Sequence, residues 1–253
     1  MLFSNLGQLD LAEAAFLQLQ EVAIETYGRG SPYQAIALGG RGEIEVERGF
    51  PELGAAWLAE SIEMFGHQIS SRDYGPMSNY NALGRAFLHA GDLTAATEVF
   101  QECIALNEYY FFPVTTFLSE SLTGLGQVEL ARRDFRAAAE YLEEALILRE
   151  GNPALDLPHE LPETRLALGF ALWGAGLERE RALRLIRASE FELEHPREPC
   201  YYCAVYRAEL ERWFGENPDA AAISEPLRTP APARLNMWTN APRWKREQKG
   251  RAM

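Results

Sequence analysis

The sequence lacks the features that mark membrane proteins, secreted proteins and disulfide scaffolds. No apolar run in its 253 residues approaches the ~18 residues that cross a bilayer. The N-terminus shows neither the basic segment nor the apolar core of a secretory signal. Only three cysteines occur, an odd number that does not suggest a disulfide framework. We therefore expect a cytoplasmic protein that does not associate with membranes.

Residue types that carry catalysis or bind metals are scarce and scattered. None of the four histidines stands in a recognisable catalytic motif with a serine or cysteine. Cys200 and Cys203 have the spacing of a redox pair, but the βαβ pattern that surrounds such pairs is absent. With His195 they supply three zinc ligands, and a structural zinc site needs four. We predict no enzyme, no cofactor, no catalytic residue and no metal site, and expect both cysteines to pack in the core.

Negative charge dominates, with a formal net charge of −13. Seven basic and four acidic residues from Glu216 onward give the C-terminal segment +3, and the remaining 17 basic and 33 acidic residues give the body −16. Nucleic-acid binders usually carry a basic surface, so we expect no nucleic-acid binding by the body of the chain. An acidic body favours basic or neutral partners.

Four series of residues recur with a period of 42 to 44 residues. Glycines recur at two phases of this period, and small and large apolar residues recur at two others. The series are Gly7, Gly49, Gly91 and Gly176; Gly42, Gly84, Gly126 and Gly169; Ala12, Gly54, Ala96, Ala138 and Ala182; and Phe16, Leu58, Phe100, Leu142 and Ile186. Arg133 stands where the first glycine series would have its fourth member. We expect the small residues where two helices approach closely, and the glycines of the first series in turns with positive φ.

The segments between these markers have the three- and four-residue apolar spacing of helices, and prolines fall at their borders. The third unit is the clearest, with Tyr80, Leu83-Gly84 and Phe87 followed by Gly91, Ala96 and Phe100. It resembles the tetratricopeptide repeat, whose signature has these residue types in this order. The 42-residue period is similar to that of kinesin light chains and of repeats in many bacterial signalling proteins.

This resemblance implies an all-α fold, a right-handed α-solenoid of antiparallel helix hairpins. We assign residues 1–215 to about four and a half repeats and a C-terminal capping helix. Residues 216–253 are proline-rich and then basic, and we predict that they are disordered.

Two units depart from the pattern. The first begins at Met1, six residues before Gly7, so its first helix is nearly missing and an apolar edge is left uncovered. Self-association through residues 1–27, or preceding sequence in a longer chain, would cover this edge. The second unit carries Gly39, Gly40 and Gly42 in one helix, which predicts a loosely packed or kinked helix.

A solenoid of helix hairpins presents a concave surface that is suited to extended or helical peptides. We predict a non-catalytic interaction module with the binding groove of the tetratricopeptide repeat family that it resembles. We expect it to be the regulatory part of a bacterial signalling protein. In that family the first helix of each pair lines the groove. The residues we expect to face a protein or peptide ligand are Asn81, Arg85, Gln127, Phe170 and Trp173. The alternative is a self-associating scaffold protein.

Overall fold

A computed structural model describes residues 8–66, 75–109, 115–151, 157–196 and 200–221. Within those ranges every regular element is a helix and no strand occurs. The helices are α2 (Leu9–Tyr27), α3 (Pro32–Glu47), α4 (Pro51–Phe65), α5 (Gly75–Ala90), α6 (Leu93–Tyr109), α7 (Thr115–Ala131), α8 (Phe135–Gly151), α9 (Glu160–Gly174), α10 (Arg179–Glu194), α11 (Tyr201–Glu216) and α12 (Pro218–Ala221). None of these helices combines the length and apolar character that a bilayer span requires.

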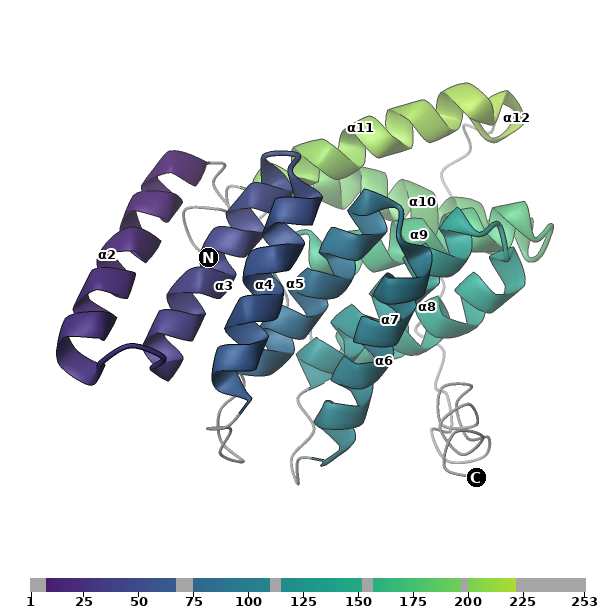
Figure 1. The fold of residues 1–253 in the computed structure, drawn as a ribbon. Coiled ribbons are helices and arrows are strands. Elements are labelled where there is room, and N and C mark those ends of the chain that lie inside the picture. Colours follow the sequence, from purple (N-terminus) through teal and green to yellow (C-terminus); the bar gives the residue numbers. More distant parts are fainter. Residues whose placement is uncertain (1–7, 67–74, 110–114, 152–156, 197–199, 222–253) are drawn as a thin grey trace, which may run out of the picture.

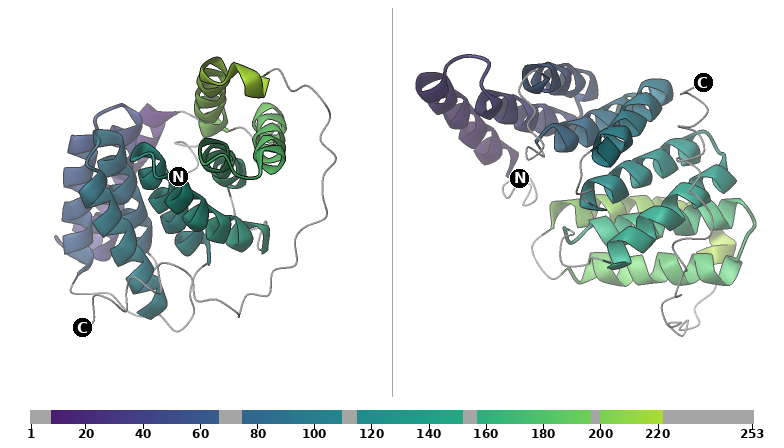
Figure 2. Two further views of the ribbon diagram at one scale, coloured as in Figure 1. Left: turned by 90° about the vertical axis from the view of Figure 1, so that its right-hand side faces the viewer. Right: turned by 90° about the horizontal axis from the view of Figure 1, so that it is seen from below.

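The helices stack as hairpins along a curved array (Figures 1 and 2). The largest contacts join α3 to α4, α5 to α6, α7 to α8 and α9 to α10. The first helices of these pairs also contact one another in sequence, so that α3, α5, α7 and α9 form one continuous row. The structure confirms the prediction of an all-α solenoid.

The turns inside the hairpins share one backbone geometry. Gly49, Gly91 and Gly176 have φ values of 87°, 82° and 67°. Arg133, at the equivalent position of the fourth unit, has a φ of 63°. In each turn this residue's N–H and that of the next residue donate to the last carbonyls of the helix, as in a Schellman motif. The prediction of positive φ is confirmed at these three glycines, and Gly7 lies outside the described residues.

The two helices of each pair approach closely because a glycine of the first helix faces a large side chain of the second. Gly42 faces Leu58, Gly84 faces Phe100, Gly126 faces Leu142 and Gly169 faces Ile186. A Cβ added to any of these glycines would overlap the facing side chain. The four large residues are fully buried, as are Ala96, Ala138 and Ala182 of the small series. Two of the periodic series in the sequence are thus the two sides of one contact.

The prediction of a loose or kinked helix around Gly39, Gly40 and Gly42 is wrong. Helix α3 is continuous through all three glycines. Gly39 packs against Asn79 of α5, Gly40 against the ring of Phe16, and Gly42 against α4. Each glycine therefore admits a different neighbour, and the three together let α3 pack tightly on three sides.

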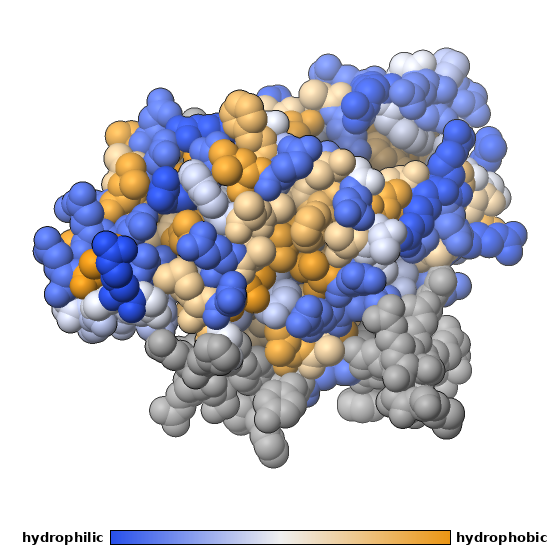
Figure 3. Space-filling view, viewed as in Figure 1, coloured by the Kyte–Doolittle hydropathy of each residue, from blue (hydrophilic) through white to orange (hydrophobic). Residues whose placement is uncertain are grey.

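The described helices extend slightly past residue 215, where we expected the repeat region to end. After α11, the single turn of α12 carries Ala220, which is fully buried. Residues 222–253, which include the basic segment, lie outside the described residues, as do residues 1–7. Figure 3 shows hydrophilic side chains along α11 and α12 and apolar ones gathered over the middle of the same face.

Gly126→Ala should lower the free energy of unfolding by about 1–3 kcal/mol, because the new methyl group overpacks the contact with Leu142. Gly215→Ala is the matched control, since a Cβ at that helical position meets nothing within 4 Å. The control should gain about 0.5–1 kcal/mol from the better helix propensity of alanine. Urea denaturation of both variants measures the difference, and equal midpoints would contradict the packing described above.

Arg133→Gly should stabilise the protein by about 0.5–1 kcal/mol, because a non-glycine residue in the left-handed region costs about 1–2 kcal/mol and glycine loses more entropy on folding. The reciprocal change, Gly91→Arg, places arginine at the same turn position one repeat earlier and should destabilise by a similar amount. Thermal unfolding of the two variants checks both signs. If both changes shift the midpoint in the same direction, the turn is not the cause.

Candidate functional site

The helices α3, α5, α7, α9 and α11 bring a set of half-buried charged groups together. The set comprises the carboxyl groups of Glu43, Glu47, Glu120, Glu163 and Glu209 and the guanidinium of Arg85. We call this surface the inner acidic face. Glu43, Glu47, Glu120 and Glu163 interact electrostatically with Arg85, and Glu209 interacts with Glu163 and with the exposed Arg212. The five carboxyl groups outnumber these two cations, so the face is negative when all of them are ionised.

Arg85 lies at the electrostatic centre of this face. Its guanidinium forms an ion pair with Glu120 of α7. Both side chains keep partial exposure, 34% for Arg85 and 21% for Glu120. Burial opposes the charged form of Arg85, but the carboxylates of Glu120 and Glu43 more than offset this and raise its pKa. Arg85 therefore stays charged, and its charge is shared among several carboxyl groups.

Three carboxyl groups of the inner acidic face have raised pKa values. Burial raises the pKa of Glu43 to about 7, and the charge of Arg85 only partly opposes this. Burial also raises the pKa of Glu47 and of Glu209. At neutral pH Glu43 is therefore close to its midpoint, and an added cation on this face would favour its ionised form.

Helix α11 closes one side of the inner acidic face. The hydroxyl of Tyr202 donates a hydrogen bond to Glu47, which joins α11 to α3 across 155 residues of sequence. The Tyr202 ring packs on His159 at 4.6 Å between centroids. Burial, reinforced by Arg85, lowers the pKa of His159 to about 4, so this imidazole is neutral at neutral pH. In Figure 1, α11 runs along the top of the molecule from the region of α3 toward α10.

The far half of α11 is held by apolar contacts. Trp213 stacks on Phe170 of α9 at 4.8 Å and meets the edge of Trp173 at 5.8 Å. Leu210 is buried in a cluster with Leu166 and Ile186. One end of α11 is thus fixed by a polar contact to α3, and the other by packing on α9 and α10.

Three of the residues predicted to face a ligand lie on α5 and α7. Asn81 is fully buried, and its amide bonds to the Phe117 carbonyl, Glu120 and Ser121 between these helices. Arg85 is half-buried on the inner acidic face. Gln127 donates to Glu163 at 2.7 Å and so borders the same face. Asn81 accordingly supports Glu120 from behind, while Arg85 and Gln127 lie at the surface.

The other two predicted residues, Phe170 and Trp173, lie on α9 beneath α11. Trp173 is 8% exposed and receives the guanidinium of Arg179 over its ring at 4.5 Å. Phe170 is half-buried under Trp213. Binding of a partner by any of the five remains a prediction.

Sequence reasoning missed Glu43, although a signal for it was present. Glu43, Arg85 and Gln127 follow one another at the repeat period of 42, and Phe170 follows after 43 more residues. Glu120 and Glu163 are likewise related by one repeat. Tyr206 of α11 continues this second series 43 residues after Glu163, whereas Tyr202 and Glu209 belong to neither series.

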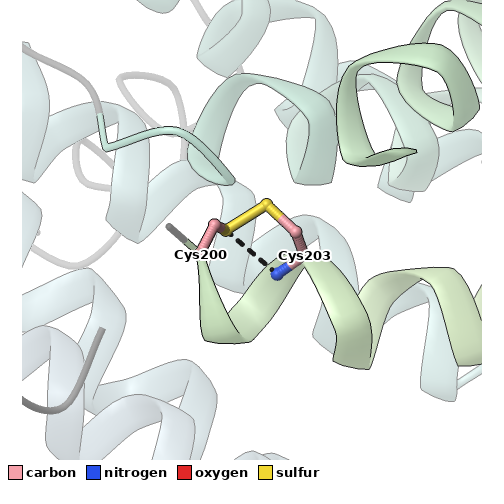
Figure 4. The surroundings of a disulfide bond; sticks show 2 residues. All are labelled: Cys200 and Cys203. Carbon is pink, nitrogen blue, oxygen red and sulfur yellow. Dashed lines mark hydrogen bonds between the residues drawn. A yellow bond between two sulfur atoms is a disulfide. The ribbon is translucent and has the colours of Figure 1, made fainter. Parts of the chain in front are cut away.

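Contrary to our expectation, Cys200 and Cys203 at the start of α11 do not pack as separate thiols. They form a disulfide between the residue that caps α11 and its third helical residue (Figure 4). The start of a helix brings positions three apart together, and the two Cα atoms here are 5.4 Å apart. Cys203 is buried and Cys200 is half-buried. In the described ranges, no cluster of three or more His, Cys, Asp or Glu side chains is placed to hold a metal ion.

Comparisons with known proteins agree with this geometry. Residues 78–110 and 118–150 each match a family model described as tetratricopeptide repeat. A search of curated proteins finds no significant match. Among solved structures, a putative kinesin light chain with TPR-like repeats from Podosopora anserina has a TM-score of 0.55 and 16% identity, over 75% of this chain and 89% of that one.

Two further structures share the fold over most of the chain. PlcR from Bacillus thuringiensis, in complex with the peptide PapR7 and DNA, has a TM-score of 0.65 and 12% identity, over 83% of this chain and 70% of that one. BtubC from P. vanneervenii has a TM-score of 0.58 and 13% identity, over 92% and 99%. At these identities the similarity shows the fold.

Glu43→Gln should raise the melting temperature more at pH 8 than at pH 5. The pKa of Glu43 is about 7 in the folded protein, against 4.5 for an ordinary glutamate side chain, so the folded state holds this proton more tightly. Its contribution to stability is complete below pH 4.5 and is lost as the pH rises through 7. Thermal unfolding at both pH values measures the effect, with Glu60→Gln on an exposed position of α4 as control. An equal shift at the two pH values would contradict the assignment.

Proposed function

Because the chain carries tetratricopeptide repeats in a solenoid of stacked hairpins, we propose that it is a non-catalytic interaction module that binds a basic peptide or protein segment at the inner acidic face. The fold supports a role in protein interaction in general terms, and the charge of this face supports a cationic partner. We propose further that the module acts in the cytoplasm, as the regulatory part of a bacterial signalling protein.

The observation that carries the proposal is that five half-buried carboxyl groups share the inner acidic face with one half-buried guanidinium, that of Arg85. Glu120 already pairs with Arg85, whereas burial raises the pKa of Glu43, Glu47 and Glu209, because nearby cations only partly offset the cost of burying their charges. A lysine or arginine side chain placed among them would favour their ionised forms and so lower this cost. Electrostatic complementarity of this kind contributes both to association rate and to specificity.

The predicted ligand-facing residues fit this proposal in different ways. Arg85 and Gln127 would contact the partner's backbone or acidic groups between the carboxylates. Phe170 and Trp173, with Trp213, would form an apolar border at the α9 end. Asn81 would act indirectly, since it is buried and holds Glu120. The structure of PlcR with the peptide PapR7 offers a precedent for a peptide on a solenoid of this fold.

Self-association is the second candidate, favoured by the outer face of α2. Leu11, Leu17 and Val22 are 54%, 43% and 50% exposed. Phe16, by contrast, packs against Gly40 within the chain. A second copy that covered α2 would bury the three exposed side chains.

Selection from a random peptide library on the immobilised protein tests the first proposal. The enriched peptides should carry an excess of lysine and arginine, and their affinity should fall as the salt concentration rises. The double change Glu163→Gln and Glu209→Gln should weaken binding about tenfold, corresponding to roughly 1.4 kcal/mol. Glutamine keeps the hydrogen-bonding capacity of each site, so the scaffold should remain intact.

The matched control is the double change Glu60→Gln and Glu98→Gln, which removes two exposed carboxyl groups from the second helices α4 and α6. This variant should bind like the wild type. Enrichment of neutral or acidic peptides, or equal weakening by both double variants, would contradict the proposal. Light scattering on the same samples shows whether the protein is a dimer, as the second candidate requires.

A further inference from the structure

The first turn of α11 joins two features that neither the repeats nor the proposed binding face explains. It carries the disulfide between Cys200 and Cys203, and between these cysteines stands Tyr202, whose hydroxyl bonds to Glu47. The residue that links α11 to α3 is therefore enclosed within the four-residue disulfide loop. Any change in this loop acts directly on that link.

The two sulfur atoms have different surroundings. Cys203 is 2% exposed, whereas Cys200 is half-buried and keeps partial solvent exposure. The Sγ of Cys200 accepts a hydrogen bond from the Cys203 N–H at 3.1 Å (Figure 4). This N–H belongs to the free end of a sixteen-residue helix, a position that stabilises a thiolate on Cys200.

Cys103 provides the contrast within the same chain. It is fully buried in α6, and burial raises the pKa of its thiol to about 12. Such a thiol is neutral and inaccessible under physiological conditions and does not exchange with disulfides. The reactive sulfur chemistry of the described residues is therefore confined to the start of α11.

We propose that Cys200 and Cys203 form a reversible dithiol–disulfide site, and that the oxidised pair holds the first turn of α11 in the conformation that places Tyr202 on Glu47. The reductant is a dithiol, either a small molecule or a protein of that chemical class. The inference concerns the chain alone and does not depend on the binding function proposed above.

Reduction of the pair takes place in two thiol–disulfide exchanges. A thiolate of the donor attacks Sγ of Cys200, the bond between the two protein sulfurs breaks, and Cys203 leaves as a thiolate that takes up a proton. The second donor thiolate then attacks the donor sulfur of the mixed disulfide and releases Cys200. The donor becomes a disulfide, and the two electrons reside on the two protein thiols. The helix N-terminus stabilises Cys200 as it leaves.

Reduction should loosen only the beginning of α11. The second half of the helix is anchored independently by Leu210 and Trp213, which pack on α9 and α10. In the first turn, Cys203 is buried and the Tyr202 ring packs on His159. Without the covalent link, that turn can fray, and the hydrogen bond from Tyr202 to Glu47 is lost with it.

Equilibration of the full chain in dithiothreitol buffers of graded redox composition, followed by alkylation and peptide mass spectrometry, tests the chemistry. Cys200 and Cys203 should pass together from disulfide to dithiol and back as the buffer changes, while Cys103 stays unmodified in the folded protein. A pair that remains a dithiol in the most oxidising buffer, or a disulfide in the most reducing one, would overturn the proposal.

Amide hydrogen exchange of the oxidised and reduced samples tests the structural consequence. Exchange in residues 203–206 should accelerate several-fold on reduction, whereas residues 210–216 should not change. The variant Cys200→Ser/Cys203→Ser should resemble the reduced protein and ignore the redox buffer. Tyr202→Phe keeps the disulfide but lacks the hydroxyl, and should free the Glu47 end of α3 without reduction. Identical exchange in the oxidised and reduced wild type would refute the coupling.

Discussion

The close approach of glycine on one helix to a large apolar side chain on its partner is the contact on which the solenoid depends. It occurs in four successive pairs, from Gly42 with Leu58 to Gly169 with Ile186. Because the glycine has no Cβ, the helix axes can come together and the large side chain is enclosed completely. The ring of Phe100 packs against two glycines at once, Gly84 of α5 and Gly124 of α7. The same close packing sets the spacing of α3, α5, α7 and α9, and so determines which side chains meet on the inner acidic face.

Those features that repeat were predictable from the sequence, because each is a local requirement renewed every 42 residues. The glycine turns, the buried alanines and the large apolar residues all follow from the period. The two matched repeats cover residues 78–110 and 118–150, where the signature is clearest. The glycine-rich helix α3 was misjudged because helix propensity alone counts glycine as a weakness, whereas three neighbours use the space that its glycines leave.

What could not be predicted depends on contacts between positions that the repeat does not relate. The hydrogen bond of Tyr202 to Glu47 requires the curvature of the whole array, which no window of sequence encodes. The disulfide depends on where α11 begins, since the same cysteines one turn further along would lie within a regular helix. Half of the inner acidic face was accessible in principle, through the register that relates Glu43 to Arg85 and Gln127. The residues that α11 contributes to that face, Tyr202 and Glu209, could not be predicted from this register.

The contact between α11 and α3 also changes what kind of folding reaction this chain undergoes. In an open solenoid each repeat touches only its neighbours, so the array can nucleate anywhere and the ends can unravel separately. Here a link between residues 47 and 202 closes a loop through nearly the entire array, at a cost in chain entropy that grows with the length enclosed. That link can form only after the intervening hairpins have stacked. The link consequently couples the unfolding of the N-terminal and C-terminal repeats. A protein built from local modules thereby gains long-range cooperativity.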